Sequence, residues 1–310
     1  MSKILITGAG GYLGSKLAAK FLNTGHDIIA VDKLIFNQGH LVANILSHPN
    51  CQFYNLDVDQ IDNSILKQVD IIYPLAALVG MPLCKKDVNE TYRINAESIK
   101  RLVKLSSKEQ RIIFPNSNSG YGEAGNVICT EETPMNSISD YGRSKEMAEQ
   151  YVMDGLPKAT VFRLATVYGP SFRPRLDLLV NFFTYNAVHY GKLDIFEGDF
   201  NRNFVHIDDV VDAFYSMRYN GYTYGQVFNL GCDEDNMTKG QLIARIKSSF
   251  QNLKITYSDQ SDPDKRNYIV SSAKLAPYFQ AKRTINSELQ TLIKFLKLIS
   301  SENTQSMRNV

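Results

Sequence analysis

The sequence predicts an α/β fold, in which a doubly wound parallel sheet is followed by a smaller C-terminal α/β lobe. In the first half of the chain, short apolar runs alternate with helical patterns. Runs that are apolar at every position are typical of parallel strands that helices cover on both faces. After the Gly169-Pro170 pair the alternation loosens, which favours a separate organisation for the rest of the chain.

The individual elements follow from these patterns. The expected strands of the first half are Lys3–Thr7, Asp27–Val31, Gln52–Asn55, Asp70–Tyr73, Arg111–Pro115 and Ala159–Leu164. The expected helices are Tyr12–Asn23, Asn89–Ser107, Tyr141–Asp154, Leu176–Tyr190, Ile207–Arg218, Lys239–Phe250 and Asn286–Ile299. We therefore expect a first domain over residues 1–168, a lobe over 169–300 with some segments returning to that domain, and a flexible tail over 301–310.

Charge and composition exclude several classes of protein. With 34 Lys and Arg against 32 Asp and Glu, the 310-residue chain has no basic field to hold nucleic acid. No apolar run reaches the roughly 18–20 residues of a membrane span, and the early glycine turn does not fit a signal peptide. The cysteines are scattered and lack metal-site spacing: Cys51, Cys84, Cys129 and Cys232. We expect a cytoplasmic enzyme with free thiols and no metal.

A glycine turn joins the first strand to the first helix. Gly8, Gly11 and Gly14 let the backbone turn tightly, approach a pyrophosphate and pack the helix against the strand. The helix amides near Tyr12 and Leu13 would then face the phosphates of a dinucleotide. An ordinary tight turn is the alternative reading of the glycines alone.

Asp32 ends the second expected strand, where a carboxylate accepts hydrogen bonds from the ribose of an adenosine. A carboxylate also repels the 2′-phosphate of NADP. The pair of glycine turn and Asp32 therefore predicts binding of NAD.

Two further strand ends are candidate cofactor contacts. Asp57 and Val58 follow the third strand, where the carboxylate could contact the adenine amino group or cap a helix. The small side chains after the fourth strand would let a dinucleotide lie against the backbone, or could simply belong to the core: Leu75, Ala76 and Ala77.

Tyr141 and Lys145 stand four residues apart on an expected helix, so both side chains share a face. A free tyrosine has a pKa of about 10 and is a poor base near neutrality. A lysine ammonium and a cationic nicotinamide ring would stabilise the phenolate and lower that pKa. The pair therefore predicts a tyrosine base, although two exposed side chains could produce the same spacing.

Ser117 lies in a Ser- and Gly-rich segment, residues 114–122, directly after the fifth strand. The carboxyl end of a strand is where ligands lie in open α/β sheets. A serine hydroxyl there can bridge a substrate oxygen and the tyrosine, unless the segment is only a connection.

These motifs together resemble the extended short-chain dehydrogenase/reductases, specifically the NAD-dependent sugar-nucleotide epimerase/dehydratase family. The resemblance runs from Lys3 to about Lys294 and is carried by residues 7–14, 75–77, Asn95, Ser117, Tyr141 with Lys145, residues 163–170, 202–209 and 229–231. It implies a Rossmann-like NAD domain and a smaller nucleotide-sugar-binding lobe. It also implies Tyr141 as the catalytic base, Lys145 as its electrostatic partner and nicotinamide-ribose ligand, and Ser117 as the group that orients the substrate hydroxyl.

The resemblance also implies a substrate site and an assembly. Arg202 and Arg266 match phosphate-binding arginines, and Asn181 matches an amide donor to the nucleotide-diphospho-sugar. Arg173 and Arg175 are weaker candidates for the same anion, and His206 is expected to anchor a helix start. A homodimer through a four-helix bundle is the family's usual assembly. An apolar stripe fits that bundle but could instead face the sheet of its own subunit: Val88, Tyr92, Ala96, Ile99 and Val103.

The residues after Ser117 limit the reactions that we expect of this chain. Where related dehydratases carry Asp-Glu, this chain has Asn118 and Ser119, neither of which can act as a general acid or base. Dehydration and decarboxylation are therefore disfavoured, which leaves C4 oxidation, 4-epimerisation or reduction of a keto sugar.

A narrower resemblance, over residues 75–84, 115–122, 175–182 and 262–268, is to a bacterial capsule subgroup that includes a GDP-heptose 4-dehydrogenase. We therefore expect an NAD-dependent nucleotide-sugar 4-dehydrogenase of capsule or surface polysaccharide biosynthesis. The alternatives are a 4-epimerase that uses the same transient 4-keto chemistry and a non-catalytic NAD-binding protein of the same fold. Cys84 could touch the substrate, but a packing thiol is the simpler role.

Overall fold

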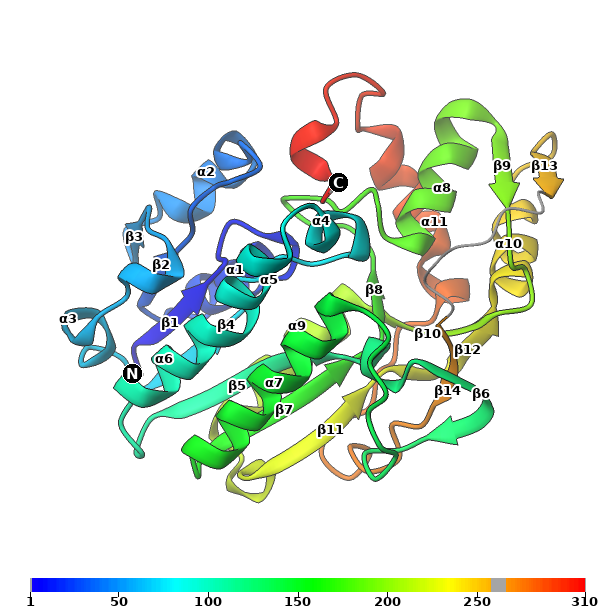
Figure 1. The fold of residues 1–310 in the computed structure, drawn as a ribbon. Helices are drawn as coiled ribbons and strands as arrows, with labels where there is room; N and C mark the ends of the chain where they lie inside the picture. Colours follow the sequence, from blue (N-terminus) through cyan, green and yellow to red (C-terminus); the bar gives the residue numbers. More distant parts are fainter. Residues whose placement is uncertain (1, 258–265, 310) are drawn as a thin grey trace.

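A seven-stranded parallel sheet forms the centre of the computed structural model, which describes residues 2–257 and 266–309 (Figure 1). Its strands lie in the order β11 (Gln226–Leu230), β7 (Ala159–Leu164), β5 (Arg111–Ser117), β4 (Ile71–Pro74), β1 (Ile4–Thr7), β2 (Ile28–Val31) and β3 (Cys51–Tyr54). The chain runs outward from β1 to β3 and then returns to β4 on the other side of β1. This reversal opens a crevice at the carboxyl ends of β1 and β4.

Helices cover both faces of this sheet, which confirms the predicted doubly wound α/β fold. One face packs against α1 (Tyr12–Asn23), α2 (Gly39–Leu46) and α9 (Ile207–Ser216). The other packs against α3 (Asn63–Leu66), α6 (Ser98–Leu105) and α7 (Asp140–Gly155). The inner strands β1, β2 and β4 are largely apolar because both of their faces are buried.

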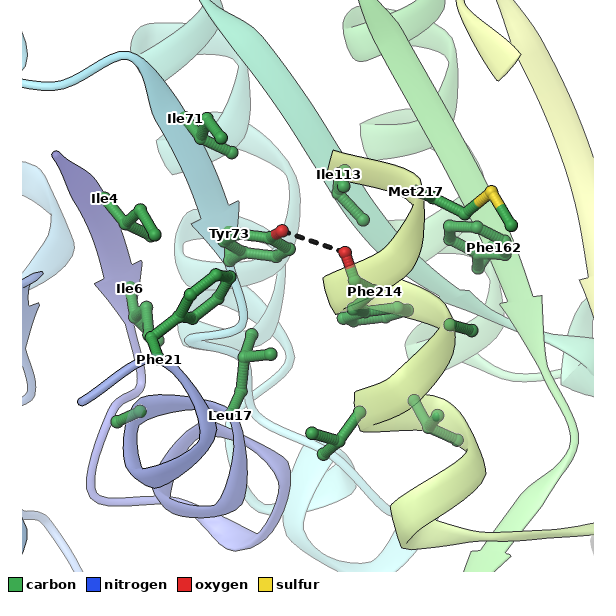
Figure 2. Packing of buried hydrophobic residues seen from close by; sticks show 14 of the residues in the cluster. Ile4, Ile6, Leu17, Phe21, Ile71, Tyr73, Ile113, Phe162, Phe214 and Met217 are labelled. Atoms are coloured by element: carbon green, nitrogen blue, oxygen red, sulfur yellow. Dashed lines mark hydrogen bonds between the residues drawn. The ribbon is translucent and has the colours of Figure 1, made fainter. Parts of the chain in front are cut away.

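Aromatic rings fill the layer between the sheet and α9 (Figure 2). Phe214 of α9 stacks on Tyr73 of β4 and on Phe162 of β7, with ring centroids 6.1 and 5.4 Å apart. The Tyr73 hydroxyl donates a hydrogen bond of 2.9 Å to the Phe214 carbonyl, so this buried hydroxyl does not lack a partner.

A second lobe has its own core, built from α8 (Leu179–Tyr190), α10 (Lys239–Lys247) and α11 (Ile285–Lys297). Three small sheets accompany these helices: β12 (Cys232–Thr238), β10 (Asn201–His206) and β8 (Thr166–Tyr168); β13 (Lys254–Tyr257) and β9 (Lys192–Ile195); β14 (Asn267–Val270) and β6 (Glu123–Cys129). Both β11 and α9 come after Tyr168 in the chain yet pack with the large sheet, so the two parts are interwoven.

The helix expected over Asn89–Ser107 is divided. The chain forms α4 (Met81–Lys86), α5 (Val88–Tyr92), a π turn (Arg93–Glu97) and then α6. The apolar stripe proposed for a dimer faces its own subunit at its centre, because Ala96 and Ile99 are buried and Ile99 packs against the large sheet. Residues 262–265 of the narrower family motif lie outside the described residues.

The expectation of a flexible tail is wrong for residues 304–309, which pack against the loop before α8. Arg173 donates from Nε to the Ser306 carbonyl (2.8 Å) and from Nη2 to the Arg308 carbonyl (3.1 Å). The Leu176 amide donates to the Met307 carbonyl over 2.9 Å. Local composition could not indicate this, because the partners of the tail lie more than a hundred residues earlier in the chain.

Phe214→Ala is expected to lower the free energy of unfolding by about 3–5 kcal/mol, because it opens a cavity among closely packed rings. The matched control is Tyr222→Ala, at a tyrosine that is 82% exposed, which is expected to change stability by less than about 0.5 kcal/mol. Urea unfolding followed by circular dichroism measures both, and equal effects would contradict this account of the core.

Candidate active site

One cavity of about 560 Å³ lies where the carboxyl ends of the central strands face the second lobe. The structure brings nearly all of the predicted site residues to its wall: Gly8, Gly11, Tyr12, Leu13, Gly14, Asp32, Asp57, Val58, Leu75, Ala76, Ala77, Ser117, Tyr141, Lys145, Arg202 and Arg266. Asn181 is the exception. Residues far apart in the sequence meet here because parallel strands end at the same edge of a sheet.

The glycine turn has no room for side chains. Gly8 has φ +68°, and a Cβ on it would lie 2.7 Å from the Ala76 amide nitrogen. A Cβ on Gly14 would lie 2.0 Å from the Gly8 carbonyl oxygen. No side chain caps α1 at Gly11, so the amides of its first turn are available to an anion.

Two carboxylates stand at the same end of the cavity. Asp32 accepts hydrogen bonds from the amides of Gly10 (2.8 Å) and Leu34 (2.7 Å), while burial raises its pKa. Asp57 caps the 3₁₀ helix Val58–Gln60, as the alternative reading of the sequence allowed.

Asp57 also forms ion pairs with Lys33 (2.7 Å) and Arg93 (3.1 Å). Burial works against ionisation, but hydrogen bonds from Arg93 and Lys33 hold the pKa of Asp57 well below its usual range. The carboxylate is therefore already engaged in structural contacts.

Ser117, Tyr141 and Lys145 come together from two neighbouring elements. Ser117 is the last residue of β5, and α7 begins beside it, capped by Ser139, whose Oγ accepts from the Gly142 amide. Asn95, in the π turn, fixes the loop after β4 against α7. It exchanges two hydrogen bonds of 2.8 Å with the Leu78 backbone and donates to Ser144 Oγ over 3.2 Å.

Burial controls the ionisation of both catalytic candidates. Burial raises the pKa of Tyr141, and the Cys84 thiol adds to that effect, while a hydrogen bond with Ser117 and the charges of Arg266 and Arg175 lower it. The net direction is upward, because burial outweighs the neighbouring cations of the protein. The expected lowering also counted the charge of a nicotinamide ring. Burial also lowers the pKa of Lys145 to about 7, and its Nζ lies 4.0 Å from the centroid of the Phe114 ring.

Glu149 was missed by the sequence analysis. It lies one helical turn after Lys145, forms a buried ion pair of 2.7 Å with Arg163 of β7, and accepts a hydrogen bond from Asn116 Nδ2. Its charge raises the pKa of Lys145 against the effect of burial. The four-residue spacing from Lys145 could have revealed it.

The arginines predicted to bind the substrate differ in what holds them. Arg202 Nη1 donates to the Asn201 carbonyl (2.9 Å) and to the Arg266 carbonyl, so β10 and the segment before β14 are linked at the cavity wall. Arg175 pairs with Asp177 over 2.5 Å. Arg173 is turned to the C-terminal tail.

Asn181 does not line the cavity, contrary to the prediction that it contacts the substrate there. Its Oδ1 accepts from the Gly169 amide (3.0 Å), and its Nδ2 donates to the Arg175 carbonyl (3.1 Å) and the Tyr12 hydroxyl (3.3 Å). With 1% of its surface exposed, it fastens the turn after β8 to the first helix. The amide is therefore structural.

Two other side chains have the structural roles expected of them. His206 caps α9, since its Nδ1 accepts from the Asp208 amide over 3.2 Å, and burial lowers its pKa to about 4. Cys84 is buried, its Sγ lies 3.4 Å from the Leu78 carbonyl, and burial raises its pKa to about 11. Among residues 2–257 and 266–309, no cluster of His, Cys, Asp and Glu is placed to hold a metal ion.

Residues 4–231 match the model of the NAD dependent epimerase/dehydratase family. The chain belongs to this family. The expectations of an NAD-dependent enzyme and of NAD as cofactor are confirmed at this level. In the part of the chain that the structure describes, no helix has the length and apolar character needed to cross a membrane.

Known members of the epimerase/dehydratase family resemble the chain over most of its length. It is 27% identical to a UDP-glucose 4-epimerase of Lactobacillus helveticus, over 74% of this chain and 76% of that protein. It is 23% identical to UDP-glucuronic acid decarboxylase 1 of Xenopus tropicalis, over 88% of this chain and 67% of that protein. The crystal structure of UDP-glucuronic acid 4-epimerase from Bacillus cereus, in complex with UDP-glucuronic acid and NAD, has the same fold, with a TM-score of 0.85 and 22% identity over 96% of this chain and 99% of that one. Epimerases and a decarboxylase share this similarity, so the reaction has to be inferred from side chains.

Lys145→Met is expected to stabilise the protein at low pH. Burial sets the pKa of Lys145 to about 7 in the folded state, against about 10.4 in an unfolded chain. Between these values the unfolded state binds more protons, so the cost of the buried ammonium is full below about pH 7 and declines as the pH rises toward 10.

Urea unfolding of wild type and variant at about pH 6 and about pH 9 measures this difference, which should be smaller at the higher pH. Lys67→Met, at an exposed lysine, is the control. A stability difference that does not depend on pH would contradict the assignment.

Proposed function

We propose that the protein binds NAD and a nucleotide-diphospho-sugar in this one cavity and oxidises C4 of the sugar. The observation that carries the proposal is the half-buried Tyr141, hydrogen-bonded to Ser117 and placed with Lys145 in the cavity that the glycine turn also lines. A base, a hydroxyl orienter and a dinucleotide cradle in one cavity are the parts that alcohol oxidation requires.

The cofactor end suits a dinucleotide. The space that a Cβ would fill at Gly8 and Gly14 is taken by backbone, so these glycines would hold the pyrophosphate against the first turn of α1. Asp32 would accept hydrogen bonds from the adenosine ribose, and Lys145 would donate to the nicotinamide ribose. When bound, NAD supplies the hydride acceptor.

The catalytic residues have different roles in removing the proton from the C4 hydroxyl. Tyr141 accepts the proton of the C4 hydroxyl, and Ser117 holds that hydroxyl and the phenol together. A phenol accepts a proton only as the phenolate, so the cations around Tyr141 must work against its burial. Arg175 and Arg266 have that effect on its pKa, and Lys145 stands four residues away on the same helix face.

The acids of the cavity argue against dehydration. Among the described residues, its carboxylates are Asp32, Asp57 and Asp177, and each already accepts hydrogen bonds from the protein. Asn118 and Ser119 are buried and do not line the cavity. Among the described residues of this wall, the Asp-Glu pair of the related dehydratases therefore has no counterpart, which supports an enzyme that stops at the 4-keto sugar or reduces it again.

The second candidate is a 4-epimerase, in which the 4-keto sugar is reduced on its other face. The similarity to UDP-glucose 4-epimerase favours it. The GDP-heptose substrate rests on the narrower sequence resemblance. A place in capsule biosynthesis is favoured by that resemblance and by 28% identity to protein CapI of Staphylococcus aureus. A non-catalytic NAD-binding protein of the same fold fits less well, because Ser117, Tyr141 and Lys145 are all present and close together.

We also propose a cytoplasmic homodimer formed through α5, α6 and α7. Val88 and Met147 on these helices are each 38% exposed, which supports a contact there. Sedimentation equilibrium distinguishes a dimer from a monomer, and a monomer at micromolar concentration would contradict this assembly.

Tyr141→Phe is expected to lower the rate of hydride transfer by about 10²–10⁴-fold, because it removes the proton acceptor while keeping the ring. Binding of NAD should be retained, since the glycine turn and Asp32 are untouched. Stopped-flow absorbance of the reduced nicotinamide measures the first effect and calorimetry the second. Tyr222→Phe, at an exposed tyrosine, is the control, and unchanged turnover in Tyr141→Phe would overturn the proposal.

A panel of GDP-, UDP-, CDP- and dTDP-sugars, including a GDP-heptose, distinguishes the two candidate reactions. A dehydrogenase releases a 4-keto sugar with one equivalent of reduced cofactor. An epimerase gives an inverted C4 centre without net reduction. NMR of the products together with nicotinamide absorbance separates these outcomes, and loss of water or carbon dioxide from the sugar would contradict both.

A further inference from the structure

The last residues of the chain form part of the cavity wall. Asn309 lines the cavity together with Gly80, Arg173, Arg175 and Asp177. It is 3% exposed, and its carbonyl oxygen would lie 3.8 Å from a Cβ on Gly80. Figure 1 shows the chain end, marked C, beside α4. The tail therefore bridges the loop after β4 and the loop before α8, two elements that face the catalytic residues.

Arg173 anchors this tail. Its side chain is 2% exposed and spends its hydrogen bonds on the Ser306 and Arg308 carbonyls, while its guanidinium stacks 4.2 Å from the centroid of the Phe36 ring. A buried guanidinium is costly without such partners, and burial lowers its pKa to about 10. These contacts commit Arg173 to the chain end and not to a substrate anion.

A line of polar contacts leads from the tail to the catalytic tyrosine. The backbone N–H of Asn309 donates a hydrogen bond to the Asp177 carboxylate. Asp177 in turn accepts from Nε (2.8 Å) and Nη2 (2.5 Å) of Arg175. Arg175 lines the cavity near Tyr141, and its charge favours the phenolate.

We propose that residues 304–309 are a positioning element of the active site, which holds the Asp177–Arg175 pair so that the Arg175 guanidinium faces the cavity that Tyr141 also lines. The inference rests on the proposed role of Tyr141 as the base. A bidentate pair fixes the direction of a guanidinium as well as its place, and Asp177 is fixed in turn by a backbone amide of the tail. Without the tail, the Asp177–Arg175 pair loses one of its supports and gains access to water, where its charge acts less strongly on the phenol.

The other groups that act on the pKa of Tyr141 are Cys84 of α4, Ser117 of β5 and Arg266 before β14. Arg175 is the member of this set that hydrogen bonds link to the tail, through Asp177. Arg175 is therefore the member of this set that a change in the tail should affect.

Deletion of residues 304–310 tests the proposal in two ways. The ionisation midpoint of Tyr141, obtained from the phenolate absorbance of the deletion protein minus that of the same protein carrying Tyr141→Phe, is expected to rise by about one pH unit. The rate of hydride transfer is expected to fall by up to about 10²-fold, with its pH profile shifted in the same direction. Glu302→Ala, at an exposed residue just before the tail, is the control and should change neither.

Arg173→Gln supplies a second variant in case the deletion protein does not fold. It removes the anchor but keeps the chain complete, and it should reproduce the rise in the midpoint, while calorimetry shows NAD binding retained. A lower melting temperature with an unchanged Tyr141 midpoint in both folded variants would overturn the proposal, because a merely structural tail predicts that result. The midpoint does not depend on turnover. Failure of the proposed reaction, seen as full activity in Tyr141→Phe, is therefore distinguishable from failure of this inference.

Discussion

The close approach of the turn after β1 to the end of β4 is the constraint on which the rest of the site depends. These two strands are neighbours at the point where the strand order reverses, and a Cβ on Gly8 would collide with the Ala76 backbone. The glycine spacing is thus required by packing before any ligand is considered. The same closeness places the first turn of α1 at the mouth of the crevice, where its amides can meet an anion.

Burial of charge gives the site its chemical character. Tyr141 and Lys145 are both withdrawn from water, and burial moves their pKa values in opposite directions, toward the neutral form of each. The protein compensates with charges at fixed positions: Glu149 acts on Lys145, while Arg175 and Arg266 act on Tyr141. Glu149 is held by Arg163 and Asn116 of neighbouring strands, and Arg175 by Asp177 of its own loop. The ionisation of the site therefore depends on contacts well beyond the helix that carries the pair.

The interweaving of the two parts of the chain also makes the site depend on tertiary contacts. Tyr12, in the first turn of α1, donates to the Gly169 carbonyl over 2.8 Å, and Ser171 Oγ donates to the Tyr12 carbonyl over 2.7 Å. The first turn of α1 and the loop that leads to Arg173 and Arg175 are therefore joined beside the cavity. The C-terminal tail lines the cavity from the side of α4.

The sequence by itself determined the parts that depend on local spacing. Strand and helix alternation predicted the doubly wound sheet, the glycine turn predicted a dinucleotide site, and the four-residue spacing predicted that Tyr141 and Lys145 share a helix face. Each of these needs only neighbours in the chain and the rule that parallel strands end at one edge. A serine at the end of the fifth strand followed in the same way, while the family resemblance selected Ser117.

Only the tertiary structure decided the roles that depend on distant partners. The sequence predicted Asn181 as a substrate ligand, but its side-chain amide forms hydrogen bonds with Gly169, Arg175 and Tyr12. The sequence predicted a flexible tail, but Arg173, more than a hundred residues earlier in the chain, donates hydrogen bonds to two of its carbonyls. Burial raises the pKa of Tyr141, and the depth of burial is a property of the packed fold. No local pattern reports either a long-range hydrogen bond or the loss of water around a side chain.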